Sequence, residues 1–191
     1  CRQCDRECTL HDHQPERLWG HLDTCQYRTI LHGMRGHQGG IDIAPGEIGI
    51  SQGFTTLKGP ARLENFQPHM HMRGKAMSME AIYPDGRKRI LSQVNNFQWQ
   101  WHVNYIFADD AAPLLPAGTT LVITAWHDNT AENANNPDHT QWVGWGDRTV
   151  DEMAHAWVDV TYLPQEEFDW LIAEREAPEQ ERQRQNQSAG S

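Results

Sequence analysis

The sequence predicts an all-β domain, an antiparallel β-sandwich of jelly-roll-like arrangement. The 191 residues suffice for one domain of about 100 to 150 residues with short additions at its ends. From Ile41 onward, short apolar or alternating runs follow one another, separated by turn sequences such as Ala-Pro-Gly at 44–46, Lys-Gly-Pro at 58–60 and Asn-Pro-Asp at 136–138. Strands at such spacing are typical of a sandwich.

The clearest expected strands carry β-branched and aromatic residues in alternation with polar ones. Between two of them, Pro84-Asp85-Gly86 predicts a hairpin turn, because Asp-Gly adopts positive φ at little cost. The connection 128–147, rich in Asn, Asp, Pro and Gly, is long enough to be expected to carry function. The five expected strands are 62–71, 77–83, 87–91, 121–127 and 153–162.

Three segments are expected: a Cys/His-rich irregular segment at 1–40, the β domain at 41–164, and a short helix with a disordered tail at 165–191. The formal net charge of −10 argues against a nucleic-acid partner. No apolar run is long enough for a membrane span. All four cysteines lie within the first 25 residues, so chemistry further along must use His, Met or carboxylates.

Residues 68–75, Pro-His-Met-His-Met-Arg-Gly-Lys, are the most informative in the chain. In a strand, His69 and His71 project from the same face and can offer two imidazoles to one ion. Met153 opens another expected strand, and two imidazoles with a thioether favour copper over zinc, magnesium or calcium. The alternatives are half-buried structural histidines and a core methionine.

Residues 41–163 resemble the C-terminal domain of the copper type II, ascorbate-dependent monooxygenases, the superfamily of peptidylglycine α-hydroxylating monooxygenase and dopamine β-hydroxylase. The similarity is greatest to the bacterial branch. It rests on seven motifs in order: 69–75, 83–86 (Tyr-Pro-Asp-Gly), 97–101 (Phe-x-Trp-x-Trp), 116–119 (Pro-x-Gly-Thr), 127–130 (His-x-Asn-Thr), 136–138 (Asn-Pro-Asp) and 145–153 (Trp-Gly-Asp-x-Thr-x-Asp-Glu-Met).

The resemblance implies one copper per chain held by His69, His71 and Met153, which are then also the catalytic centre. It implies dioxygen and a small-molecule substrate as reactants, C–H hydroxylation as the reaction, ascorbate or another donor as reductant, and a secreted or periplasmic location. The family's second, three-histidine copper domain has no counterpart here, since no adjacent His-His pair occurs. We therefore expect an electron-donating partner domain outside this chain.

Because residues two apart in a strand lie on the same face, His155 and Trp157 share the face of Met153 and are candidates for a substrate pocket. For Trp157, a place in the core is an equally good interpretation. His127 is a third pocket candidate, with an extra ligand and a hydrogen-bonded structural histidine as its two interpretations. Asp151 and Glu152 precede the Met. They either orient a ligand imidazole or accept backbone N–H bonds.

Three tryptophans, Trp99, Trp101 and Trp126, are expected in the core.

Residues 1–36, with Cys at 1, 4, 8 and 25, resemble the zinc-binding segment of insertion-sequence transposases, although the second cysteine pair of such a site is missing. A fusion remnant is the preferred interpretation of that segment. For the β domain, the alternative to an enzyme is a copper- or ligand-binding β-sandwich without turnover.

Overall fold

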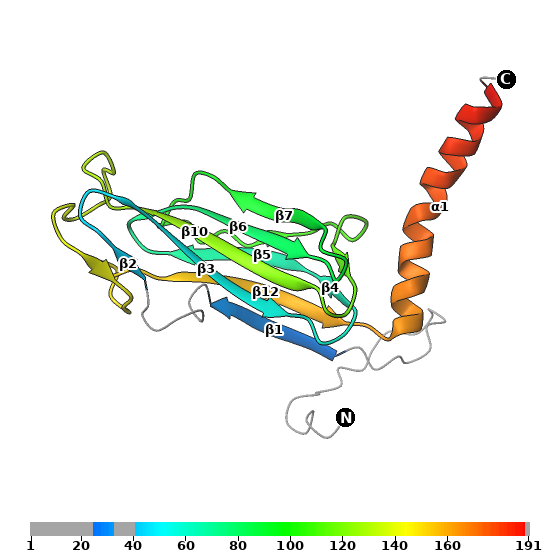
Figure 1. Ribbon diagram of the computed structural model, residues 1–191, viewed down its shortest axis with the longest axis horizontal. Helices are drawn as coiled ribbons and strands as arrows, with labels where there is room; N and C mark the ends of the chain where they lie inside the picture. Colours follow the sequence, from blue (N-terminus) through cyan, green and yellow to red (C-terminus); the bar gives the residue numbers. More distant parts are fainter. Residues whose placement is uncertain (1–24, 33–40, 190–191) are drawn as a thin grey trace, which may run out of the picture.

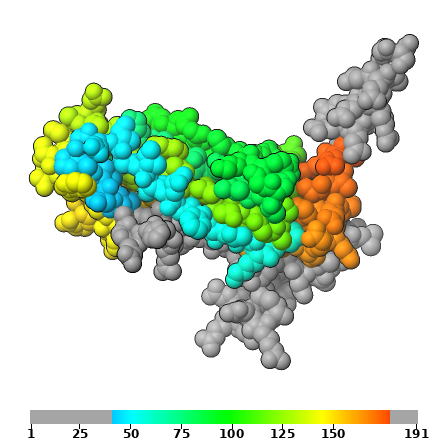
Figure 2. Space-filling model, viewed as in Figure 1, coloured from blue at the N-terminus to red at the C-terminus, as the bar shows by residue number. Residues whose placement is uncertain are grey.

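The protein is an antiparallel β-sandwich with one C-terminal helix, as the sequence predicts (Figure 1). The computed structural model describes the backbone of residues 25–32 and 41–189 and the side chains of residues 41–177. The helix α1 stands at one end of the sandwich, and β2 lies at the opposite end with the loops around residues 130–150 (Figures 1 and 2).

The first sheet is centred on β12, which pairs antiparallel with β1 on one side and with β5 and β4 on the other. The two partners on that second side form one strand interrupted at Glu64. Short edge strands β8 and β9 complete the sheet. The bounds are β1 Cys25–His32, β4 Ala61–Leu63, β5 Asn65–Met70, β8 Tyr105–Ile106, β9 Leu114–Leu115 and β12 Ala154–Tyr162.

The second sheet has the order β3-β10-β6-β7, again antiparallel. Its central strand β10 alternates buried and half-buried residues, as expected of a strand with one face on a core. β2 and β11 pair with each other in a separate two-stranded ribbon, whose Ile43 and Val143 pack into the core. The bounds are β2 Asp42–Ile43, β3 Ile48–Thr56, β6 Gly74–Ile82, β7 Lys88–Val94, β10 Thr120–Asp128 and β11 Val143–Gly144.

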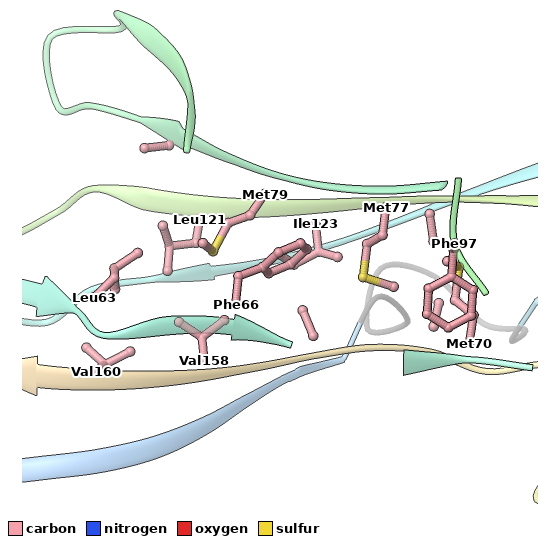
Figure 3. Close-up of a cluster of buried hydrophobic side chains, with 14 of the residues drawn as sticks. Leu63, Phe66, Met70, Met77, Met79, Phe97, Leu121, Ile123, Val158 and Val160 are labelled. Atoms are coloured by element: carbon pink, nitrogen blue, oxygen red, sulfur yellow. The ribbon is translucent and has the colours of Figure 1, made fainter. Parts of the chain in front are cut away.

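The core fills the space between the two sheets (Figure 3). Met77, Met79, Leu121 and Ile123 point down from the second sheet toward Phe66 of the first, and all five side chains have no exposed surface. Since each fully buried side chain of this size contributes about 1.5 to 3 kcal/mol, this layer is the main source of stability.

The five expected strands are present with shifts of a few residues at their ends, and the turn at 84–86 joins β6 to β7 with Gly86 at φ 85°. β1 is a correction to the irregular segment expected at 1–40. It contains the β-prone Tyr, Thr and Ile, and β12 offers it an open edge. The rest of that segment, including the possible zinc site, lies outside the described residues.

The helix α1, Gln165–Ala189, is longer than expected and continues through the tail predicted to be disordered. The Glu, Gln and Arg residues of the tail have high intrinsic helix propensity, which does not depend on burial. Its first turns pack Phe168, Leu171 and Ile172 against Leu114 and Leu163. No helix in the described part of the chain is long and apolar enough to cross a membrane.

Candidate metal centre

The histidines of residues 68–75 lie on the outer face of the first sheet, away from the core. Along β5 the core-facing Pro68 and Met70 are buried, and His69 between them is half-buried. β12 pairs with β5 so that His155 lies directly opposite His69. Continuing this register by two residues puts Met153, just before β12, opposite His71. The backbone thus brings the two ends of the predicted site together.

The rings of His69 and His71 are spaced as two ligands of one ion would be. Their centres are 5.5 Å apart and their planes are nearly perpendicular, at 81°. Two imidazoles that each place one nitrogen about 2.0 to 2.1 Å from a tetrahedral ion have ring centres about 5 Å apart. The spacing of the two rings therefore matches that of two imidazoles on one ion.

The orientation of His71 is fixed by a backbone carbonyl. Its Nδ1 lies 3.1 Å from the carbonyl oxygen of Asp151, which can only accept a hydrogen bond. The proton must therefore sit on Nδ1, which leaves the lone pair on Nε2 for a metal. The Asp151 carboxylate instead pairs with Arg148 at 2.7 Å. A carbonyl, and not the carboxylate considered from the sequence, orients this imidazole.

Glu152 ties the His-x-His segment to the loop that carries Met153. Its side chain is fully buried and accepts the backbone N–H groups of His71 at 3.1 Å and Arg73 at 2.7 Å. This agrees with the second of the two roles considered for the residue, acceptance of backbone N–H bonds. Burial raises the pKa of Glu152 to about 7, while the bonds from Arg73 and His71 and the Arg73 charge act to lower it.

Arg73 is buried beside this carboxylate, 4.0 Å from Glu152 Oε1. Its guanidinium donates to Asn129 Oδ1 at 2.9 Å and to the Val150 carbonyl at 2.8 Å. Asn129, also buried, donates in turn to the carbonyls of Ala44 and Gln141. A continuous polar network therefore holds the connection 128–147 and the loop before Met153 against the end of β5.

His127 belongs to this network and not to an open pocket. It has no exposed surface, its Nε2 donates to the carbonyl of Met153 at 3.0 Å, and Glu152 Oε2 is 3.5 Å away. Its Nδ1 has no hydrogen-bond partner among the described residues. Burial lowers the pKa of His127 to about 4, so the ring is neutral at pH 7. Of the sequence interpretations, the hydrogen-bonded structural histidine describes this residue.

The other two pocket candidates, His155 and Trp157, lie on the same outer face as His69. The Trp157 ring is parallel to that of His69 within 3°, with centres 5.8 Å apart, and the His155 ring centre is 6.0 Å away. Burial, together with His102, His71 and His155, lowers the pKa of His69 to about 4. The imidazole is consequently neutral at pH 7, the state that binds metals.

His102 is a member of this cluster that sequence reasoning missed. Its Nδ1 is 3.2 Å from Nδ1 of His69, and the two ring centres are 4.4 Å apart. It lies in the connection between β7 and β8, outside any expected strand, so face alternation could not link it to His69. Its position next to Trp101 in a His-containing aromatic stretch was the one available signal.

A small hollow lies beside the connection that carries His102. It has a volume of about 140 Å³ and is lined by Phe97, Trp101, Val103, Tyr105 and four other residues. Phe97 also stacks on the His102 ring, with centres 6.2 Å apart. Trp101, expected in the core, is instead 72% exposed and lies in the connection between β7 and β8. This hollow is as large as cavities that accept one aromatic ring.

Among the described side chains, no three His, Cys, Asp or Glu residues form a group that could hold an ion by themselves. A metal at His69 and His71 would therefore depend on a ligand of another kind, such as the Met153 thioether, or on solvent. Two imidazoles and a thioether form a donor set that suits copper.

Comparisons with known proteins do not name a family. No protein-family model matches the chain, and no curated protein matches its sequence. A solved structure, the cryo-EM structure of the virus-like particle of extra small virus from the giant freshwater prawn Macrobrachium rosenbergii, aligns with a TM-score of 0.33 at 8% identity. The alignment covers 84% of this chain and 94% of that one.

Proposed function

We propose that this chain is the copper-binding domain of a copper-dependent monooxygenase, which uses dioxygen to hydroxylate a C–H bond of a small molecule. The observation that supports this most is the pair of His69 and His71, with ring centres 5.5 Å apart, beside the start of the strand that follows Met153. The proposed ligands are these three residues.

The reaction converts R–H, dioxygen, two electrons and two protons into R–OH and water, with ascorbate or a similar reductant as the electron source. Bound copper would supply the one-electron steps of this chemistry. Two neighbours of the proposed ligands would keep them in position. The Asp151 carbonyl keeps the Nε2 lone pair of His71 available, and Glu152 fixes the backbone at His71 relative to the loop of Met153.

The hollow beside the connection that carries His102 is our candidate for the apolar part of the substrate. Its aromatic lining favours a single ring or a short aliphatic chain over a charged group. Full turnover requires an electron-donating partner domain, which would approach the half-buried His69 on the outer face of the first sheet.

Copper titration of the full chain, in competition with a chromophoric chelator, tests the site. We expect one copper per chain, loss of at least tenfold in affinity in His69→Ala and His71→Ala, and a reduced preference for Cu(I) in Met153→Ala, because the thioether is the soft ligand. His139→Ala, which alters an exposed loop histidine, is the matched control. Unchanged stoichiometry and affinity in both histidine variants would contradict the site.

Activity is tested separately, as the ratio of hydroxylated product to oxygen consumed, with ascorbate and a panel of small aromatic and aliphatic substrates. We expect slow oxygen use and little product from the isolated chain, and coupling of the two when an electron-donating copper domain is added. Copper binding without oxygen chemistry in either case favours the second candidate, a non-catalytic copper- or ligand-binding β-sandwich.

A further inference from the structure

His102 contacts the cluster in a way that neither the His-x-His pair nor the Met loop accounts for. The connection carrying it is held against β5 at two points. Gln67 Nε2 donates to the His102 carbonyl at 3.2 Å, and the two Nδ1 atoms of His102 and His69 lie 3.2 Å apart. The Phe97 ring stacks on that of His102, with centres 6.2 Å apart. The ring is therefore oriented by its backbone and by a neighbour, although it is exposed.

Two ring nitrogens at 3.2 Å form a hydrogen bond only when one carries a proton and the other a lone pair. For His71 the Asp151 carbonyl leaves no choice, and Nδ1 carries the proton. For His69, the contact with His102 determines which ring nitrogen carries the proton. If His69 donates, its Nε2 keeps a lone pair, and both imidazoles of the His-x-His pair then present the same kind of atom to an ion.

We propose that His102 is a positioning residue of this site, whose Nδ1 accepts the Nδ1 proton of His69 and so keeps the Nε2 lone pair of His69 available to the metal. The role of His102 toward a metal rests on the proposed function, whereas its hydrogen bond with His69 and the resulting tautomer do not require a bound metal. His102 acts on His69 as the Asp151 carbonyl acts on His71. Ligating histidines commonly have such a partner on the second ring nitrogen.

The competing possibility is that His102 is itself a ligand. Two nitrogens on one tetrahedral ion are about 3.3 Å apart, close to the 3.2 Å between these two atoms. Direct ligation would use Nδ1 of His69 and turn its Nε2 away from the ion. It would also make a group of three histidines with His71, which the described side chains do not form. The positioning role requires no such group.

The first measurement is the tautomer of His69 in the metal-free full chain, from long-range ¹H–¹⁵N spectra of the histidine rings. We expect Nδ1–H in the wild type, a mixture with Nε2–H in His102→Ala, and Nδ1–H again in His102→Asn, whose amide oxygen can accept the same proton. His139→Ala should leave the His69 signals unchanged. A wild-type His69 in the Nε2–H form overturns the inference.

The second measurement is copper affinity of the same variants. Loss of a residue that orients a ligand typically lowers metal affinity 10- to 100-fold, so we expect that loss in His102→Ala and recovery to within about threefold in His102→Asn. Equal losses in both variants, together with one fewer coordinated nitrogen in the Cu(II) paramagnetic resonance spectrum, would make His102 a ligand and refute the positioning role. If the wild type binds no copper, the proposed function fails, and the tautomer measurement still decides the hydrogen bond.

Discussion

Replacement of Glu152 by Gln should change how the stability of the protein depends on pH. The carboxylate is fully buried, and burial raises its pKa from 4.5 to about 7. Between these two pH values the folded protein retains a proton that the unfolded chain has released. The stability contributed by the protonated group is therefore complete below about pH 4.5 and is lost as the pH rises to about 7. Gln has nothing to titrate and keeps the shape of the side chain.

The expected size follows from the displacement of the pKa. At about 1.36 kcal/mol for each pH unit, a change from 4.5 to about 7 corresponds to about 3 kcal/mol. The free energy of unfolding of the wild type, relative to Glu152→Gln, should fall by that amount between pH 4.5 and pH 8. A constant offset of about 1 to 3 kcal/mol is superimposed, because the Gln amide can accept only one of the two backbone N–H bonds.

Urea unfolding of both proteins, at half-unit steps across this pH range, measures the difference. The buried His127 titrates in both proteins, so its contribution largely cancels. Glu132→Gln, at an exposed position of the connection 128–147, controls for the loss of one negative charge. A difference that stays constant from pH 4.5 to pH 8 would show that Glu152 is not held in the dry network described above, and would refute the reasoning.

Three further changes test the same region by urea unfolding. In His127→Gln we expect the opposite pH effect, because burial lowers the pKa of the ring from 6.5 to about 4. The neutral ring contributes about 3 kcal/mol of stability, which is present above pH 6.5 and is lost as the pH falls to about 4. A difference between variant and wild type that does not change with pH would contradict this. Gly74→Ala should lower the free energy of unfolding by about 1 to 3 kcal/mol, because the added Cβ would lie 2.6 Å from the Met70 Cβ. A variant as stable as the wild type would disprove this crowding. Asn129→Ala should lower the free energy of unfolding by about 2 to 5 kcal/mol, because it removes the acceptor of Arg73 Nε and two hydrogen bonds to backbone carbonyls. A decrease below about 0.5 kcal/mol would mean that the network does not hold the connection 128–147.

Much of the β-sandwich could be predicted because its signals are local. Alternation along β10 and the Pro-Asp-Gly turn before β7 specify strands and a hairpin from a few adjacent residues. The same alternation predicts one face for His69 and His71, and their ring centres lie 5.5 Å apart. The helix end was misjudged for the converse reason: the tail has no apolar residues to bury, but its propensity for helix is independent of burial.

The polar network could not be predicted, because its bonds join segments far apart in the chain. Glu152 accepts from residues about 80 positions away, and nothing in the order of residues shows which backbone groups a buried carboxylate will meet. His102 was missed for a similar reason, since a residue in an irregular connection has no periodicity that fixes its direction.

The sequence by itself determined the class of fold and predicted a shared face for the two histidines and a set of soft ligands, because side-chain type and two-residue periodicity are properties of neighbouring positions. Only the tertiary structure decided the register of β5 with β12, which sets His155 opposite His69, and the tautomer of His71. Those features depend on contacts between distant strands, whose geometry is fixed only when both sheets close on their common core.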